Sequence, residues 1–304
     1  MATLGLFFTL LVSIFLPSWG QIDLGESVTS SSYGDIIDCP PKEVIYPCQC
    51  WESTLYDAWQ MQCDSVYSES ELANVFHKDL GTKTIGNLMV YGNIFLRKLH
   101  NGVFGDYKFK TFEVLFTSLV SMEPDVLINS TEILRELTVA FTSISEVPVD
   151  YRFQNLEFLQ LKGNKIPSMP ILDLQALNTL DMGWNPLKEI PSDPFRNLPN
   201  LKRLGLSGCQ IQSLPQKLFA YPEKMEYMEM FENEIRHISE DTFSGLTAIT
   251  TLDLSQNQIS TVAPGAFTGL SNAELGLQDN AITTLEEEIL ATNTKQQCLH
   301  LVGR

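Results

Sequence analysis

Basic residues and histidines are scarce in this sequence. The 304 residues contain 20 Lys and Arg and 4 His against 37 Asp and Glu, which gives a formal net charge of −17. Nucleic-acid binding needs basic patches that neutralise phosphates, and an acidic surface repels a polyanion. We therefore expect no nucleic-acid partner. The acidity favours solubility, and attraction of basic partners is the alternative interpretation.

Motifs for catalysis are also missing. The sequence has no G-x-S-x-G, no H-E-x-x-H and no glycine-rich phosphate loop. An enzyme needs chemical groups that converge on one spot, yet the histidines fall in separate parts of the chain, at His77, His100, His237 and His300. We therefore predict that the chain is not an enzyme and that it has neither a cofactor nor a metal site.

Long apolar runs are confined to the N-terminus. Residues 1–20 hold an apolar stretch from Leu4 to Leu16, followed by Pro17 and by small residues at Ser18 and Gly20. That stretch is too short to span a bilayer, and the small residues suit cleavage by signal peptidase. We predict a signal peptide over 1–20, a secreted, extracellular product, and no membrane span in the rest of the chain.

Cysteines are few, but four of the six lie close together. After an acidic, Ser-rich linker over 21–38 come Cys39, Cys48, Cys50 and Cys63. Such a cluster in an exported chain indicates disulfides, and four cysteines allow three pairings. Zinc is the rival interpretation, but C-x-C without a flanking histidine is poor zinc spacing. Residues 39–72 are therefore expected to form a Cys-rich N-terminal cap.

A repeat fills the chain beyond the cap. From Ile85 onward the pattern L-x-x-L-x-L-x-x-N-x-L recurs, where L is any apolar residue. Its Asn-type position falls at Asn93, Thr117, Thr142, Asn164, Asn185, Cys209, Asn233, Asn257 and Asn280. The spacings are 24, 25, 22, 21, 24, 24, 24 and 23 residues, which is the period of leucine-rich repeats. A second column with a spacing of 24 contains Phe195, Phe219, Phe243 and Phe267.

The residue types of the repeat predict its structure. In L-x-L both apolar side chains enter the core from one strand face, while the residues between them face outward. The turn after each strand buries backbone groups, which an Asn side chain can satisfy from coil to coil. Cys209 is expected to serve the same structural role as a buried thiol. We predict an α/β leucine-rich-repeat solenoid with a curved parallel sheet and a mostly irregular convex side.

The repeats are expected to occupy residues 73–304, with an incomplete last copy. Adding 24 to 280 reaches Arg304, the last residue, with Leu299 and Leu301 at core positions. Cys298 has no evident mate, because Cys209 lies about four coils away, about 19 Å at the strand spacing, and a disulfide needs Cα atoms within about 7 Å. We expect that the sequence is a truncated form of a longer, capped protein.

Several short motifs resemble one arthropod group of secreted proteins. They are Cys39-Pro40, Pro47-Cys48-Gln49-Cys50, Cys63, Glu71-Leu72-x-x-Val75-Phe76 and Leu96-x-x-Leu99-x-x-Gly102-Val103-Phe104-Gly105. The group is named for the non-catalytic, leucine-rich-repeat subunit of oplophorus-luciferin 2-monooxygenase. The resemblance runs from Cys39 to Arg304 and is most specific from the cap to the first coil.

The resemblance implies disulfides Cys39–Cys50 and Cys48–Cys63, and an extracellular accessory protein that binds and stabilises a protein partner. Members are expected to carry a C-terminal cysteine cap, which this sequence lacks. The alternative is a fragment of a Toll- or Slit-type receptor ectodomain, or an innate-immune recognition protein. That class would show a second capped array or an apolar segment of about 20 residues, and the sequence contains neither.

The outward strand positions are the predicted partner-binding surface, on the concave face. Most are small, polar or acidic, and the residues that stand out are Phe158, Arg203, Tyr227, Glu229 and Phe231. Aromatic residues and arginine are enriched among interface hot spots, although isolated exposed aromatics are common. The only N-glycosylation sequon, Asn129-Ser130-Thr131, lies between strands, and a glycan there would mark that side as solvent-facing.

Overall fold

The computed structural model describes residues 39–53, 58–270, 273–283 and 299–300. The chain divides into two compact units, residues 1–36 and 37–304, and the fold described below belongs to the second. The predicted signal peptide and linker lie outside the described residues, and so do Cys298 and Leu301.

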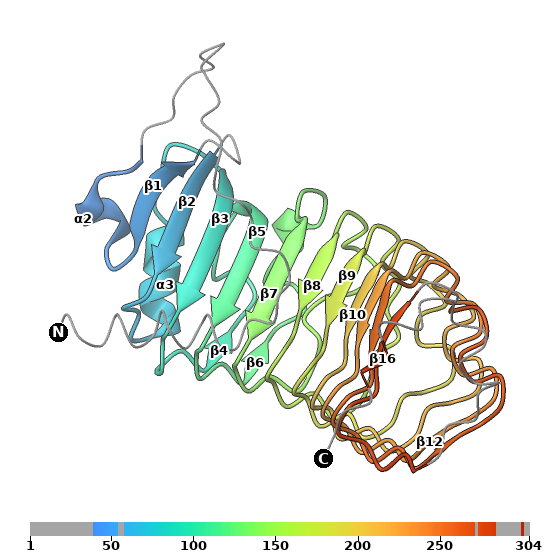
Figure 1. The fold of residues 1–304 in the computed structure, drawn as a ribbon. Helices are drawn as coiled ribbons and strands as arrows, with labels where there is room; N and C mark the ends of the chain where they lie inside the picture. The colour runs from blue at the N-terminus through green and yellow to red at the C-terminus, as the bar shows by residue number, and fades with distance from the viewer. Residues whose placement is uncertain (1–38, 54–57, 271–272, 284–298, 301–304) are drawn as a thin grey trace. The chain divides into compact units, whose positions relative to one another are not determined.

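One sheet of twelve strands runs through the second unit (Figure 1). Its strands, in spatial order, are β1 (Gln49–Ser53), β2 (Ala58–Cys63), β3 (Thr84–Tyr91), β5 (Lys108–Leu115), β7 (Glu136–Ala140), β8 (Phe158–Gln160), β9 (Thr179–Asp181), β10 (Arg203–Gly205), β11 (Tyr227–Glu229), β13 (Thr251–Asp253), β15 (Glu274–Gly276) and β16 (Leu299–His300). Only β1 and β2 are antiparallel; every later pair is parallel. The spatial order follows the chain, as stacked coils require.

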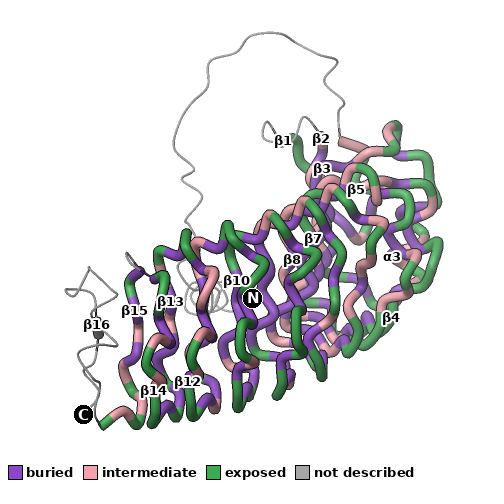
Figure 2. Tube along the Cα trace, turned by 90° about the vertical axis from the view of Figure 1, so that its right-hand side faces the viewer, coloured by how far each residue is buried: buried purple, intermediate pink, exposed green. Residues whose placement is uncertain are grey.

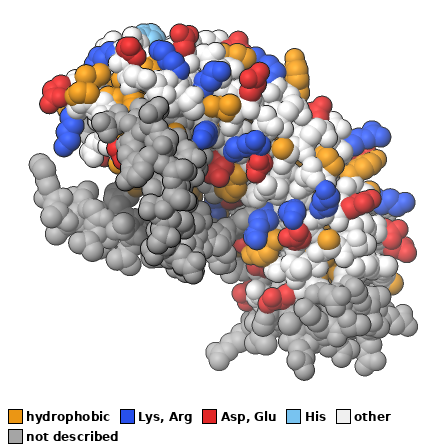
Figure 3. Space-filling model, turned by 90° about the horizontal axis from the view of Figure 1, so that it is seen from above, with side chains coloured by type: hydrophobic (Ala, Val, Ile, Leu, Met, Phe, Trp, Pro, Cys, Tyr) orange, Lys and Arg blue, Asp and Glu red, His pale blue; other side chains and the backbone are white. Residues whose placement is uncertain are grey.

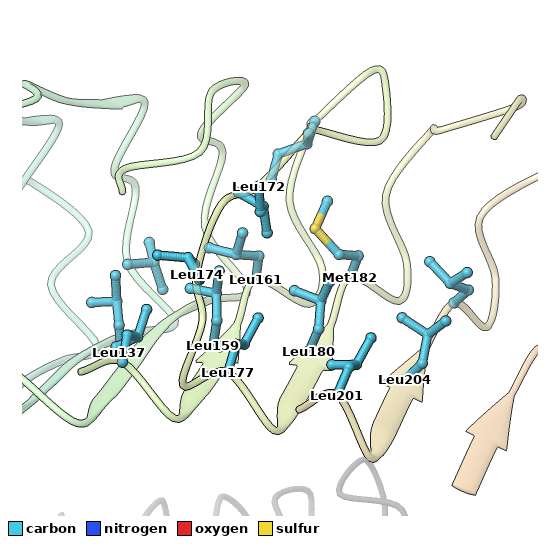
Figure 4. Close-up of a cluster of buried hydrophobic side chains, with 14 of the residues drawn as sticks. Leu137, Leu159, Leu161, Leu172, Leu174, Leu177, Leu180, Met182, Leu201 and Leu204 are labelled. Atoms are coloured by element: carbon cyan, nitrogen blue, oxygen red, sulfur yellow. The ribbon is translucent and has the colours of Figure 1, made fainter. Parts of the chain in front are cut away.

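The register of the sheet aligns the repeat positions. Leu204 pairs with Leu180 on one side and with Met228 on the other, so equivalent apolar side chains lie next to one another in the core. Figure 4 shows such side chains pointing to the same interior side of successive strands. The tube in Figure 2 shows buried residues along the coils where these strands pass. The predicted leucine-rich-repeat solenoid is therefore confirmed.

The Asn-type positions form the predicted ladder. Nδ2 of Asn233 donates to the carbonyl of Leu206 in the preceding coil at 2.9 Å, and Oδ1 accepts the N–H groups of Cys209 and Ile211 at 3.0 and 3.1 Å. Cys209 continues the ladder, since its thiol lies 3.3 Å from the carbonyl oxygen of Met182. These bonds satisfy backbone groups that the turns bury.

The opposite side of the coils is made of turns and very short elements. These are β4 (Lys98–Leu99) paired with β6 (Ser121–Met122), β12 (His237–Ile238) paired with β14 (Thr261–Val262), and the 3-10 helix η1 (Ile128–Ser130). The second apolar column packs here as a stack of buried rings. Phe195, Phe219, Phe243 and Phe267 have successive centroid distances of 5.7, 5.6 and 5.8 Å.

The cap covers the first coil. It contains α2 (Lys42–Ile45), the β1–β2 hairpin and α3 (Glu69–Phe76), which begins after Ser68, whose side chain accepts the N–H of Glu71. Disulfides Cys39–Cys50 and Cys48–Cys63 confirm the pairing that the resemblance implies. Among the described residues, no helix is long and apolar enough to cross a membrane.

The residue before each ladder position turns the chain in the left-handed region of backbone space. Six of these nine residues are glycines or polar residues, but Phe116, Phe141 and Trp184 also have φ of 53°, 52° and 59°. A bulky residue in this conformation is uncommon. The glycines that follow leave room for the rings: a Cβ at Gly163 would lie 2.6 Å from Phe141, and one at Gly208 would lie 2.8 Å from Trp184.

Candidate partner-binding face

The outward side of the twelve-stranded sheet, here called the sheet face, carries the residues predicted to bind a partner. Because strands β8, β9, β10, β11 and β13 are three residues long and in register, each contributes two outward side chains, and a third lies two residues beyond the strand. Equivalent outward residues therefore form columns across the coils, as the alternating pattern predicted.

The structure brings three of the predicted residues together. Arg203 pairs in register with Tyr227, and its guanidinium carbon lies 5.6 Å from the centre of the tyrosine ring. The Tyr227 hydroxyl donates to Oε1 of Glu229 at 2.9 Å. Burial, with the neighbouring Glu229, raises the pKa of the Tyr227 hydroxyl. The tyrosine therefore stays neutral and keeps this hydrogen bond.

The other predicted residues are more widely spread. Phe231 lies two residues beyond the end of β11 and is half-buried, while Phe158 lies on β8, three strands from Tyr227, or about 14 Å at the usual strand spacing. Glu229 is only 6% exposed, so its carboxylate is held in the surface and does not project as freely as the alternation suggested. The five residues thus divide into one connected group of three, Arg203, Tyr227 and Glu229, and two separate aromatics.

Acidic side chains on the sheet face lean over glycines of the next coil. A Cβ at Gly205 would lie 2.7 Å from the Asp181 carboxylate, and one at Gly276 would lie 2.8 Å from that of Asp253. Each carboxylate also accepts the N–H two residues ahead, that of Gly183 or that of Ser255, at 2.9 Å. Burial raises the pKa of Asp181, and its nearest basic group is Lys162.

A second group lies nearer the cap and was not singled out from the sequence. On β3 and β5, Nδ2 of Asn87 donates to Oε1 of Glu113 at 2.7 Å, and Oδ1 of Asn87 has no partner. The repeat placed both residues in outward columns, together with Glu136. Nothing in the pattern showed that they meet, because contact depends on how the side chains lean across strands.

Two histidines that are 23 positions apart in the sequence line the same hollow. The hollow lies between α3 and the turn over residues 100–103, where His100 Nδ1 lies 2.5 Å from Glu69 and His77 Nε2 lies 3.1 Å from the Gly102 carbonyl. The hollow contains no cysteine, and its one serine is Ser70. Within the described ranges, no three His, Cys, Asp or Glu side chains are close enough to hold a metal ion.

The remaining predicted positions lie away from the sheet face. Burial raises the pKa of the Cys209 thiol to about 12, so the thiolate that reacts as a nucleophile is not formed at neutral pH. Asn129 is exposed in η1, and its Nδ2 donates to the Gly105 carbonyl at 2.9 Å. The sequon is thus accessible on the side of the coils opposite the sheet, and glycosylation there stays a prediction.

Comparison with known proteins agrees with this architecture. A family model described as "Leucine rich repeat" matches residues 199–259 and 232–282. The chain is 28% identical over 170 residues to the "Oplophorus-luciferin 2-monooxygenase non-catalytic subunit" of Oplophorus gracilirostris, a match that covers 55% of this chain and 46% of that protein. The resemblance inferred from the cap motifs is therefore confirmed, and the match spans about half the length of that relative.

Solved structures share the fold at low sequence identity. One is a chain of the TLR13–ssRNA13 complex, at 22% identity and a TM-score of 0.56, which covers 79% of this chain and 31% of that one. Another comes from the octameric complex of Latrophilin 3, Unc5D and FLRT2, at 21% identity and a TM-score of 0.55, with 78% and 80% covered. These likenesses concern the fold alone.

Proposed function

We propose that this chain is a secreted, non-catalytic leucine-rich-repeat protein that binds a protein partner through its sheet face and stabilises it. The observation that carries this proposal is that core-filling residues, hydrogen-bonding residues and outward residues occupy separate positions in each coil. Leucines fill the core and the asparagine-type residues satisfy the buried turns, so the outward columns are the strand positions that take neither of these two roles.

The similarity to a non-catalytic subunit supports the same conclusion. So does the high pKa of Cys209, the one free cysteine among the described residues. Export is supported by the two cap disulfides, which persist in oxidising compartments. Expression in insect cells followed by N-terminal sequencing of the medium tests export; a mature protein that begins at Gln21 is expected, and retention inside the cells would contradict it.

The sheet face is tested by mapping and by substitution. The native protein is first cross-linked in its source fluid, and mass spectrometry identifies the partner and the residues that contact it. Tyr227→Ala combined with Phe231→Ala is then expected to weaken capture of that partner by at least about tenfold, since loss of a hot-spot aromatic removes about 2 kcal/mol or more. The variant should keep the circular dichroism spectrum of the wild type.

The matched control removes two large exposed side chains elsewhere. Tyr151 and Ile171 are 67% and 74% exposed and lie in turns off the sheet. Tyr151→Ala combined with Ile171→Ala should leave capture unchanged. Equal capture by both double variants, or cross-links confined to the turns, would remove the sheet face as the binding surface.

A further inference from the structure

The first coil has one more residue than the next coils between its ladder position and the core residue that follows. In the next two coils, the residue two places after the ladder position is buried, as Leu119 and Ile144 are. In the first coil that residue is Phe95, which is 57% exposed, and Leu96 is buried in its place. The pairing shows the same shift, because β3 and β5 pair at a difference of 24 in residue number and β4 and β6 at a difference of 23. The extra residue therefore turns Ile94 and Phe95 outward.

These two side chains belong to an apolar patch on the turns that follow the strands. The apolar patch consists of Tyr67, Ile94, Phe95 and Val120, which are 64%, 65%, 57% and 39% exposed. The ring centres of Tyr67 and Phe95 lie 5.6 Å apart, and the N–H of Val120 donates to the carbonyl of Arg97 at 2.8 Å. On the surface seen in Figure 3, by contrast, hydrophobic side chains lie among acidic and basic ones. Adjoining exposed apolar side chains indicate a contact surface.

Two exposed cations adjoin the apolar patch. Arg97 and Lys98 follow it in the chain, and neither forms an ion pair with another described residue. Of the acidic residues around Tyr67, Glu71 accepts the N–H of Tyr67 at 2.7 Å, and Asp64 accepts the hydroxyl of the next residue at 3.4 Å. These carboxylates thus have donors of their own, whereas within the described ranges the two cations have no carboxylate partner.

Charge decides between the possible occupants of the apolar patch. A second copy related by two-fold symmetry would set Arg97 and Lys98 against the same residues of the other copy, which like-charge repulsion disfavours. An anionic lipid surface would attract the two cations but repel a chain whose net charge is −17. A segment of another protein that carries an apolar side chain between carboxylates meets neither objection, because its few charges act only near the apolar patch.

We propose that the apolar patch, together with Arg97 and Lys98, is a second contact surface, which binds a short acidic segment of a protein partner. An aliphatic or aromatic side chain of that segment covers Ile94 and Phe95, and its carboxylates pair with the guanidinium and the ammonium group. The apolar patch lies on turns outside the strands of the sheet face. The inference therefore goes beyond the proposed function and does not depend on which residues of the sheet face bind.

The test uses the purified full chain and two fluorescent peptides, Asp-Phe-Leu-Asp-Leu-Asp and the same peptide with asparagine in place of each aspartate. Asparagine keeps the shape of aspartate but carries no charge. Measured by polarisation at low salt, the acidic peptide is expected to bind at least about fivefold more tightly, since two exposed ion pairs each contribute modestly and act together. At about 1 M sodium chloride, where the Debye length is about 3 Å, this preference should largely vanish.

Ile94→Ser combined with Phe95→Ser should weaken the binding of both peptides by at least about tenfold, as expected for the loss of an apolar anchor. The variant is expected to fold, because both side chains are more than half exposed and Leu96 fills the core position. The matched control, Tyr151→Ser with Ile171→Ser, removes an aromatic residue and an isoleucine that are 67% and 74% exposed in later coils. It should leave the binding of both peptides unchanged.

The two cations are tested in the same way. Arg97→Gln combined with Lys98→Gln should remove the preference for the acidic peptide and leave the binding of the asparagine peptide unchanged. The control is Lys188→Gln with Arg236→Gln, which removes the same charge from exposed residues that follow the ladder positions of later coils. This control should keep the preference.

Equal binding of the two peptides by the wild type would overturn the proposal, as would unchanged binding by the Ile94/Phe95 variant or an equal loss in a control pair. Two further outcomes would assign the apolar patch to another occupant and overturn the proposal as well. One is a dimer of the chain alone, measured by sedimentation, that the Ile94/Phe95 variant abolishes. The other is binding to phosphatidylserine vesicles that the same variant loses. The Tyr227/Phe231 experiment probes the sheet face, so the two proposals fail separately.

Discussion

Asn233 illustrates how one side chain joins two coils. Its amide nitrogen donates to Leu206 and Met230, both at 2.9 Å, and its oxygen accepts from Cys209 and Ile211. All of these partners are buried backbone groups of two consecutive coils. A side chain that only filled space would leave them without hydrogen bonds, so shape alone cannot replace the asparagine.

Replacement of this residue should therefore be costly. We expect Asn233→Ala to lower the free energy of unfolding by at least about 3 kcal/mol, because several buried groups lose partners worth about 1–3 kcal/mol each. Asn155→Ala is the control, since Asn155 makes one exposed bond, from Nδ2 to the Glu132 carbonyl at 2.8 Å, and should cost less than about 1 kcal/mol. Urea denaturation measures both, and similar losses would contradict the ladder's role.

The burial of Glu113 predicts how the stability of the fold depends on pH. Its pKa is raised from the ordinary value of 4.5, mainly by burial, so the folded protein holds the proton more tightly than the unfolded chain. This contribution stabilises the fold below pH 4.5 and is lost as the pH rises through the raised pKa. Glu113→Gln should therefore gain stability relative to the wild type as the pH goes from acid to neutral. Melting curves at several pH values, with Glu240→Gln as the control, measure the difference; a constant difference would disprove it.

At the scale of the element, the left-handed residue before each ladder position shapes the end of every strand. Phe116 stacks on Phe141 with ring centres 4.8 Å apart, and Phe141 lies over Gly163. Trp184 lies over Gly208 in the same way. The strain of an aromatic residue in this conformation is thus accompanied by ring packing on the neighbouring coil. Glycine there has two roles: it permits the conformation and it leaves space for the ring.

Substitutions at two glycines can distinguish the need for a left-handed conformation from the need for space. Gly208 and Gly269 both have positive φ, 66° and 95°, but a Cβ at Gly208 would lie 2.8 Å from Trp184, whereas one at Gly269 would meet nothing within 4 Å. Gly269→Ala should cost about 1–2 kcal/mol for the backbone conformation alone. Gly208→Ala should cost a further 1–3 kcal/mol or so for overpacking and shift the tryptophan fluorescence. Equal costs with unchanged emission would show that the ring gives way freely.

Over the whole molecule, stability is the sum of contacts between adjacent coils. The cap begins this series, and Asn93 of the first coil donates to the carbonyl of Cys63 at 2.7 Å. The Cys48–Cys63 disulfide closes a loop with a sequence separation of 15. The cap, the disulfide and the first ladder residue therefore form one connected end of the stack.

Loss of this disulfide should act locally. Cys48→Ala with Cys63→Ala is expected to cost about 3 kcal/mol and to increase amide hydrogen exchange in β2, β3 and β5. Strands β10 and β11, further along the stack, should stay protected. Mass spectrometry of exchanged peptides resolves these regions. Uniform loss of protection would show that the solenoid unfolds as a single unit instead.

The solenoid could be predicted from the sequence because every coil needs apolar and asparagine-type residues at the same positions, so the pattern recurs many times. The positions that Asn185 and Leu204 occupy recur in every coil and have equivalent neighbours each time. The pattern therefore specifies the environment of these two residues. Contacts that occur once are different. The hollow that His77 and His100 share depends on where α3 ends, and the bond between Asn87 and Glu113 depends on side-chain conformations. The left-handed conformation of Phe116 is also one that a bulky residue rarely adopts, so its residue type does not predict it.

The four stacked phenylalanines also bear on where the chain can change length. From Asn185 to Asn257 every coil has 24 residues, and each ring from Phe195 to Phe267 lies within 5.8 Å of the next. One inserted or deleted residue would move a ring out of line with both neighbours. The coils between Thr117 and Asn185 have 25, 22 and 21 residues and carry no such stack. Natural length variants of this protein should therefore concentrate in those earlier coils, and the phenylalanine segment should keep a constant count.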